Sequence, residues 1–250
     1  MPHGDTDRGV LLPQVASATG QQDSAALQAV RAYQSAVGLV AWNDMQGFGS
    51  MVSTTGNSDA ARNVVLYLGK HGKTRLDTQM PQGERSVRML GAYGAIQREN
   101  GSTEAIDSRN ALAGLVAYPL LDDPNFPDAS LTLIDQGNVT VDGVSLHRVS
   151  VASPWPGTGG SPNGNPPMSV VDFYFNPTTH LLIKSASSIL NNPRASEPNL
   201  QVISYADYQP VDGMLIPFQC SETLNGQQMW TLQLNQVKLN NGFSDSDFHF

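Results

Sequence analysis

Three short turns in the C-terminal half of the chain constrain its fold more than any other feature. Asp142-Gly143, Asp212-Gly213 and Asn225-Gly226 each supply residue types that tolerate positive φ, as a two-residue hairpin turn requires. β-Prone residues flank each turn, and residues 204–234 are predicted to form three strands joined by the last two turns. Because a two-residue turn joins neighbouring antiparallel strands, the order of these strands is set locally.

Alternation of apolar residues predicts which face of each strand is buried. Two strands show this alternation over several residues: Val171, Phe173 and Phe175 in one, and Met214, Ile216, Phe218 and Cys220 in the other. In the last strand the apolar positions are Trp230, Leu232 and Leu234, and they then shift by one residue to Val237 and Leu239. Such a shift reverses the buried face, so we predict a β-bulge near Asn235-Gln236, a feature that helps a sheet to curve.

Two segments have the pattern of helices that pack on such a sheet. Residues 23–37 repeat apolar side chains on one face, with Asp23 or Ser24 as the N-cap and Gly38 as the end. Residues 107–118 form the second predicted helix, which a proline terminates. Short β-prone runs separated by Gly, Asn and Pro precede and follow this second helix. The predicted fold class is therefore α+β with mainly antiparallel strands.

Composition and charge restrict the possible partners. With 250 residues and 40% hydrophobic content, the chain is long enough for one large β-domain. Its 22 acidic and 14 basic residues give a net charge of −8, which opposes binding to nucleic acid phosphates and to anionic lipid surfaces. The single cysteine, Cys220, excludes an internal disulfide and is expected to be buried. No apolar run approaches the roughly 18 residues that a membrane-spanning helix needs, so no transmembrane segment is predicted.

No short motif indicates catalysis. The histidines lack a metal-binding spacing and are interpreted as surface residues: His3, His71, His147, His180 and His249. No serine lies in a GxSxG elbow, and the glycines of residues 157–164 lack the context of a phosphate-binding loop. Asp122-Asp123 and the pair Asp245 and Asp247 lack a calcium-loop pattern. The sequence therefore predicts a protein that is not an enzyme and that has no catalytic residue, metal or cofactor.

Three segments carry a family resemblance: Val171 to Pro177, Leu181 to Lys184, and the hairpin from Tyr205 to Phe218. Together with the order of the predicted elements, they resemble the LolA-like superfamily of outer-membrane lipoprotein carriers. The resemblance implies an incomplete, strongly curved β-barrel, the LolA-like half-barrel, wrapped around helices. We expect residues 23–250 to form a single LolA-like domain and residues 1–22 to form a flexible N-terminal segment.

In that superfamily the half-barrel encloses an apolar cavity for the acyl chains of lipoproteins during transport across the periplasm. By similarity, the second helix would face strand residues across this cavity. The lining that the resemblance implies is Leu112, Leu115, Val116, Ile216, Phe218, Trp230 and Leu232. A closed apolar core would have the same periodicity, so the sequence leaves both interpretations open, together with the identity of the ligand and the oligomeric state.

The resemblance implies a periplasmic or exported protein that binds a lipid or a lipoprotein acyl chain. The apolar stretch Val10-Leu11-Leu12 is too short for a signal-peptide core, so we expect that a leader has been removed. One alternative is a regulatory protein-interaction module of the envelope-stress-sensor type, with Trp155 in the Pro- and Gly-rich loop 153–167 as the contact. Another alternative is a hydrolase whose site is assembled from distant residues.

Overall fold

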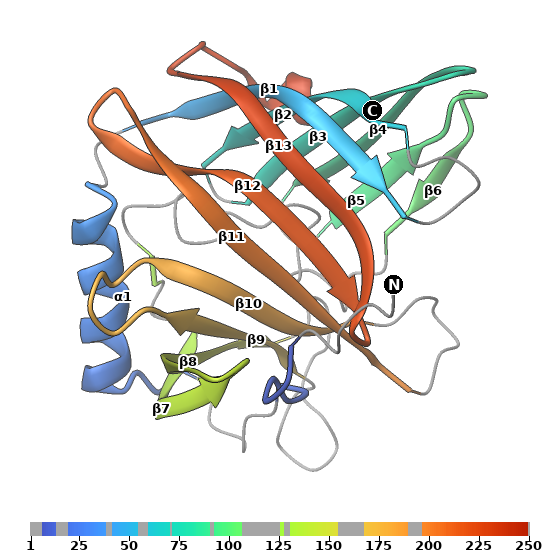
Figure 1. Ribbon diagram of the computed structural model, residues 1–250. Helices are drawn as coiled ribbons and strands as arrows, with labels where there is room; N and C mark the ends of the chain where they lie inside the picture. Colours follow the sequence, from blue (N-terminus) through green and yellow to red (C-terminus); the bar gives the residue numbers. More distant parts are fainter. Residues whose placement is uncertain are drawn as a thin grey trace.

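A curved antiparallel sheet of 13 strands dominates the computed structural model of the chain (Figure 1). The structure describes residues 7–13, 20–38, 42–54, 60–70, 72–90, 93–106, 126–127, 131–154, 168–189 and 197–249. The second predicted helix, residues 107–118, and all but the first two residues of the loop 153–167 lie outside these ranges.

The strands form two antiparallel meanders that are joined along one pair of strands. The first meander contains β1 (Asp44–Ser53), β2 (Arg62–Gly69), β3 (Lys73–Met80), β4 (Gly83–Leu90), β5 (Tyr93–Gln97) and β6 (Thr103–Ala105). The second contains β7 (Thr132–Val141), β8 (Val144–Pro154), β9 (Met168–Phe175), β10 (Leu182–Ile189), β11 (Asn199–Val211), β12 (Met214–Leu224) and β13 (Gln227–Leu239). β1 pairs with β13, and β6 and β7 lie at the two ends of the strand order, so the barrel is not closed. The predicted α+β fold class and the incomplete barrel are confirmed.

Helix α1 (Ser24–Ala36) begins at one of the predicted N-caps. The Asp23 carboxylate accepts a hydrogen bond from the Ala25 amide at 2.8 Å, which satisfies a donor that the first helical turn leaves free. The buried face, which packs on the apolar interior at helical spacing, consists of Ala26, Val30 and Tyr33. Beyond the other end of the helix, the Leu215 amide donates to the Val37 carbonyl oxygen at 2.7 Å. This bond ties α1 to the β11–β12 hairpin, and Figure 1 shows the helix beside the ends of the strands.

The three predicted hairpin turns have the expected backbone. Asp142, Asp212 and Asn225 have φ values of 51°, 49° and 50°, and the glycines that follow them have 80°, 87° and 77°. Positive φ at both central positions is typical of a type I′ turn, whose twist matches that of the flanking strands. Asn225 also fixes its turn through its side chain, because its Oδ1 accepts from the Leu200 amide at 2.9 Å.

The predicted β-bulge in the last strand is confirmed. Phe48 and Gly49 of β1 lie opposite Gln236 and Leu234 of β13, which leaves Asn235 as the extra residue. A Cβ atom on Gly49 would lie 2.1 Å from a carbonyl oxygen of β13, so the close approach of the two backbones requires glycine. The bulge therefore keeps the apolar side chains before and after it on the inner face.

One part of the strand pattern differs from expectation. The sequence pattern favours separate strands at residues 131–134 and 139–141, but residues 132–141 form one strand, β7. A register shift between Asp135 and Gly137 divides this strand and changes which residues face inward. The polar residues between the two runs thus mark a bulge rather than a turn.

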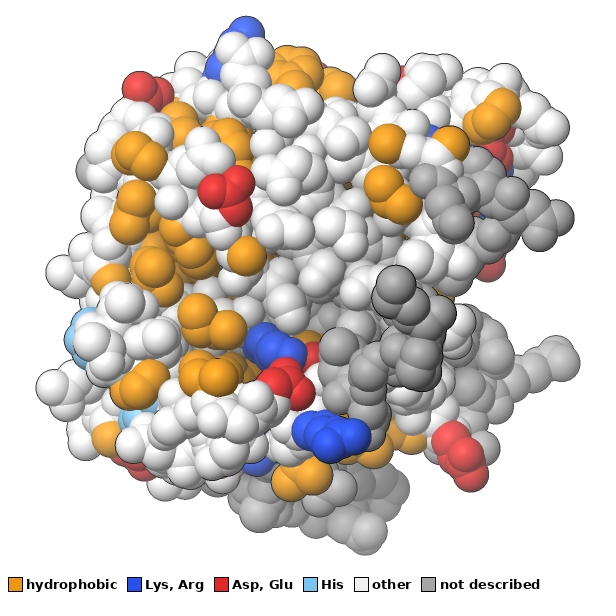
Figure 2. All heavy atoms as spheres, in the orientation of Figure 1, with side chains coloured by type: hydrophobic (Ala, Val, Ile, Leu, Met, Phe, Trp, Pro, Cys, Tyr) orange, Lys and Arg blue, Asp and Glu red, His pale blue; other side chains and the backbone are white. Residues whose placement is uncertain are grey.

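Side chains of the sheet sort into an inner and an outer face. The inner face and α1 form one apolar cluster that extends from Leu76 on β3 through β13 to Leu133 on β7. Cys220 belongs to this cluster and is 1% exposed, so its predicted burial is confirmed. On the side of the molecule drawn in Figure 2, hydrophobic side chains gather at the edge where α1 and the β11–β12 hairpin lie, and charged side chains are few.

The N-terminal segment, residues 7–13, lies on the outer face of the second meander. Val10 packs in a small apolar cluster with Tyr174 and Val202. Lys184 Nζ pairs with Asp7 and lies 2.8 Å from Asp142 Oδ2. Residues 7–13 therefore have defined contacts, while the division of the chain into a segment 1–22 and a domain 23–250 stays a prediction.

The C-terminal segment, residues 240–249, lies on the outer face of the first meander. Its 3₁₀ helix η2 (Asp245–Phe248) contacts β3 and β4. The buried Asp44 carboxylate accepts hydrogen bonds from successive backbone amides of the segment, those of Asn241, Gly242 and Phe243. Each end of the chain thus covers the meander that the opposite end of the sequence builds.

Candidate functional site

Four of the predicted ligand-binding residues lie together on the inner face of the sheet. Ile216 and Phe218 on β12 and Leu232 on β13 belong to the inner apolar cluster and are 0%, 7% and 0% exposed. Trp230 is partly buried and packs against the same cluster. The other three predicted residues lie outside the described ranges: Leu112, Leu115 and Val116. The structure thus brings the strand residues of the predicted lining together and does not test the helix residues.

A carboxyl group interrupts this apolar face beside Trp230. Glu222 lies opposite Trp230 in the β12–β13 pairing, so both side chains are on the inner face. Gln201 Nε2 donates to Glu222 Oε1, and the Trp230 side chain also hydrogen-bonds to the carboxyl group. Burial away from water raises the pKa of Glu222, and the two hydrogen bonds offset this shift only in part. The acid therefore holds its proton more tightly than an exposed glutamate does.

Hydroxyl groups form a second polar cluster on the inner face. Ser185 Oγ and Tyr205 OH are 3.0 Å apart, and Tyr208 OH donates to the Leu182 carbonyl oxygen at 2.8 Å. Burial raises the pKa values of both Tyr205 and Tyr208, so these hydroxyls are neutral at physiological pH. The inner face thus combines apolar area with a few neutral polar groups, as sites for small apolar or amphiphilic molecules do.

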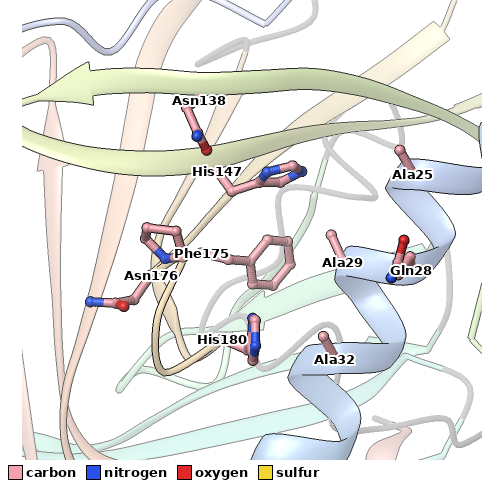
Figure 3. A pocket seen from close by; sticks show the side chains of 10 residues that line it. Ala25, Gln28, Ala29, Ala32, Asn138, His147, Phe175, Asn176 and His180 are labelled. Carbon is pink, nitrogen blue, oxygen red and sulfur yellow. The ribbon is translucent and has the colours of Figure 1, made fainter.

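A cavity of about 400 Å³ opens between α1 and the second meander (Figure 3). The helix presents three alanines and a glutamine to it, and the meander presents side chains from β7, β8, β9 and the turn after β9. In Figure 3, His147 and Phe175 point into the space across from Ala29. The full lining is Ala25, Gln28, Ala29, Ala32, Asn138, His147, Phe175, Asn176, Pro177 and His180.

His147 corrects the interpretation of the histidines as surface residues. Its side chain is 26% exposed, and its Nε2 lies 2.8 Å from Asp135 Oδ1. The nitrogen is shielded from solvent, but the two groups are not aligned for a hydrogen bond. His180 agrees with the interpretation, since it is exposed at the rim of the cavity.

A second cavity, of about 290 Å³, lies where β2, β3 and β4 meet the end of β5. Its lining is Arg62, Met80, Pro81, Gln82, Arg85 and Glu99. Arg85 Nη2 lies 2.8 Å from Glu99 Oε1, and Arg62 Nη1 donates to the sulfur of Met80. This arginine pocket carries two guanidinium groups and one carboxylate.

The sequence carries a signal for these polar groups in the phase of its strands, which short motifs do not reveal. Arg62 continues the apolar phase of Val64 and Leu66 on β2 at a spacing of two residues, and Glu222 continues the phase of Cys220 on β12. Side chains two residues apart in a strand lie on the same face. A charged residue in phase with apolar residues is therefore a candidate for an inner-face site.

Within the described part of the chain, no three His, Cys, Asp or Glu side chains gather as they would around a metal ion. Asp245 contacts Lys73 Nζ at 2.5 Å and Asp247 accepts from the Ser244 amide at 2.8 Å, so both acids have structural partners. Asp122-Asp123 lies outside the described residues. Among the helices described, none is both long enough and apolar enough to cross a membrane.

Comparison with solved structures identifies the fold. A domain from Vibrio parahaemolyticus that is assigned by name to outer membrane lipoprotein sorting is 12% identical, with a TM-score of 0.58 over 90% of this chain and 97% of that domain. A LolA superfamily protein from Nitrosomonas europaea is 11% identical, with a TM-score of 0.57 and coverage of 90% and 97%. A DUF1329 family protein from Desulfovibrio piger is also 11% identical, with a TM-score of 0.56 and the same coverage. A scan of protein-family models and a search of curated proteins find no match. The chain has the LolA-like fold, with a sequence that diverges strongly from these relatives.

Proposed function

We propose that this protein is a non-enzymatic binding protein that holds a lipidic or other apolar ligand on the inner face of its half-barrel. The observation that carries the proposal is the apolar cluster on the inner face of a sheet that does not close. An apolar ligand gains about 25 cal/mol for each Å² of apolar surface that it removes from water. A curved apolar face with few polar groups therefore favours an acyl chain over a charged metabolite.

The ligand-binding residues that we propose are those of the predicted lining. Ile216, Phe218, Trp230 and Leu232 supply the strand side, and Leu112, Leu115 and Val116 would supply the side opposite them. Partly buried members of the inner cluster, such as Met51 and Trp230, are the groups that a bound chain reaches first. The similarity in fold supports a carrier or sensor of lipoprotein acyl chains in the periplasm as the finer form of the proposal.

Fluorescence titration with N-phenyl-1-naphthylamine, a neutral apolar probe, tests the proposal on the full chain. Met51→Gln places an amide on the inner face at a partly buried position, so it should weaken probe binding about fivefold without unfolding the protein. Ser50→Gln is the matched control, because the neighbouring side chain in a strand points to the opposite face. It should leave the affinity unchanged.

Two results would count against the proposal. Wild-type protein that binds neither the probe nor an acyl chain in native mass spectrometry would exclude a binding site for apolar ligands. Equal effects of Met51→Gln and Ser50→Gln on affinity would place the ligand away from the inner face.

A further inference from the structure

The arginine pocket lies on the same face of the sheet as the apolar cluster. Arg62 is opposite Met51 in the β1–β2 pairing, and Met51 is opposite Leu232 in the β1–β13 pairing. Directly paired residues in an antiparallel sheet point to the same face. The Arg62 side chain is therefore on the inner face, one strand away from a residue of the apolar cluster and two strands away from Leu232.

The strand pairings also place the second arginine, Arg85, on the inner face. Arg85 is opposite Thr78 in the β3–β4 pairing, and Thr78 is opposite Val64 in the β2–β3 pairing. Val64 belongs to the inner apolar cluster. Both arginines thus lie on the inner face, at the margin of the apolar surface.

The charges of the pocket do not balance. Glu99 pairs with Arg85, while the hydrogen bond of the Arg62 guanidinium goes to a thioether, a weak acceptor. Arg85 Nε is buried and has no partner among the described residues. Among the residues that the structure describes, the two arginines and one glutamate of the pocket give a local charge of +1, in a chain whose net charge is −8. One buried donor without a partner and excess positive charge in a cavity of about 290 Å³ favour an oxyanion.

We propose that the arginine pocket binds the oxyanion headgroup, carboxylate or phosphate, of a lipid whose acyl chain lies on the inner face. The proposal rests on the proposed function for the position of the chain. Arg62 is the primary contact, because no carboxylate of the described pocket residues pairs with its guanidinium. Glu99 competes with the ligand for Arg85, so it lowers the affinity for an anion.

The test compares two competitors that share one chain and differ only in headgroup. Palmitate and hexadecanol are titrated into the full-length protein loaded with N-phenyl-1-naphthylamine. Arg62→Gln should lower the affinity for palmitate about tenfold, the loss of one charge-assisted contact, and leave that for hexadecanol within about twofold. Glu99→Gln should raise the affinity for palmitate, because it frees Arg85. Arg98→Gln is the matched control, since Arg98 pairs with Glu104 outside the pocket.

Each outcome decides between distinct conclusions. Hexadecanol that displaces the probe, with palmitate affinity unaffected by Arg62→Gln and Glu99→Gln, would overturn the headgroup site and leave the proposed function intact. Failure of both competitors to bind wild-type protein would overturn the proposed function and this proposal with it. Calorimetric titration with inorganic phosphate tests whether the pocket binds a free anion instead of a lipid headgroup. Arg62-dependent binding of phosphate together with Arg62-independent binding of palmitate would show a site for a free anion and overturn the lipid assignment.

Discussion

The two meanders are covered on their outer faces in different ways. The N-terminal segment covers the second meander with an ion pair that is almost fully removed from water: the exposed fractions of the Asp7 and Lys184 side chains are 5% and 13%. The C-terminal segment covers the first meander with contacts nearer to solvent, such as Lys73 with Asp245, whose side chain is 72% exposed. Water screens the ion pairs under the C-terminal segment and not those under the N-terminal segment. Ion pairs therefore contribute differently to stability on the two meanders.

The buried carboxylates on the outer faces of the two meanders also differ in the number of cations that lie near them. Arg148 Nη2 lies 2.5 Å from Asp172 Oδ2, and no second cation of the described part of the chain contributes to the pKa of Asp172. Burial raises the pKa of Asp172 in spite of Arg148 and the hydrogen bond from Ser150. On the first meander, Asp77 pairs with Arg75 and also attracts Arg88. Asp77 thus keeps a cation when one is lost, whereas Asp172 does not.

The largest effect is expected for Arg148→Met. The variant leaves Asp172 buried without its cation and should lower the free energy of unfolding by about 3–5 kcal/mol. Arg75→Met is the matched variant on the first meander and should cost less, because Arg88 remains beside Asp77. Urea denaturation of both variants measures the difference. Equal losses would show that the number of cations does not distinguish the two clusters.

Two lysines give the next comparison. Lys184 is 13% exposed and sits between Asp7 and Asp142, while Lys73 is 22% exposed and holds only the exposed Asp245. Burial alone would lower the pKa of Lys184, but the hydrogen bonds to Asp142 and Asp7 raise it above its usual value. Lys184 is therefore charged in the folded protein, and its positive charge keeps both acids paired.

Lys184→Met should leave two acids unpaired and cost about 2–3 kcal/mol, and it should release the N-terminal segment from the sheet. Hydrogen exchange at the Val10 amide, which donates to the Asp7 backbone carbonyl oxygen at 3.1 Å, reports that release. Lys73→Met should change neither stability nor exchange measurably. If Lys73→Met lost as much stability as Lys184→Met, the exposure of the lysine would not explain the difference between the two terminal segments.

The sheet could be predicted from the sequence, whereas the terminal segments that cover its outer face could not, for a physical reason. Strand order and faces follow from local signals, such as the Asn225-Gly226 turn and the shift after Leu234. The contacts of Asp7 with Lys184 and Thr223 join positions far apart in the chain, and no periodicity marks them. Charged residues on the outer phase of a strand look solvated, so their burial under a terminal segment has no sequence signature.

The candidate site shows the same division. Ile216, Phe218 and Leu232 were predictable because alternation assigns them to the buried face. Arg62 and Arg85 share that phase, but alternation does not tell whether a charged side chain in an apolar phase is paired, exposed or placed for a ligand. Three strand pairings, which join β1 to β4, were needed to place both arginines beside the apolar cluster.

The smallest effect concerns two acids on opposite faces of the second meander, Glu222 inside and Asp172 outside. Both have raised pKa values because burial disfavours their charged forms. Asp172 has a cation as its partner, whereas the hydrogen-bond partners of Glu222 are the neutral side chains of Gln201 and Trp230. Replacing the inner acid by its amide should therefore help the fold at neutral pH, and the same change at the outer acid should help it less, because Arg148 would lose its counterion.

Glu222→Gln should give a small gain in stability that depends on pH. Because the folded state raises the pKa of Glu222, it binds the proton more tightly than the unfolded state, and wild-type stability falls as pH rises from the unfolded pKa, near 4.5, through the higher folded pKa. The glutamine variant lacks this loss, so the two proteins should have equal stability below that window and diverge above it, with the variant more stable at neutral pH. Thermal melting of both proteins across this range measures the divergence, and Asp172→Asn, with a smaller gain at neutral pH, is the counterpart on the outer face. A Glu222→Gln protein that is less stable than wild type at neutral pH would show that the carboxylate has a cationic partner on the inner face, and the contrast between the two acids would fail.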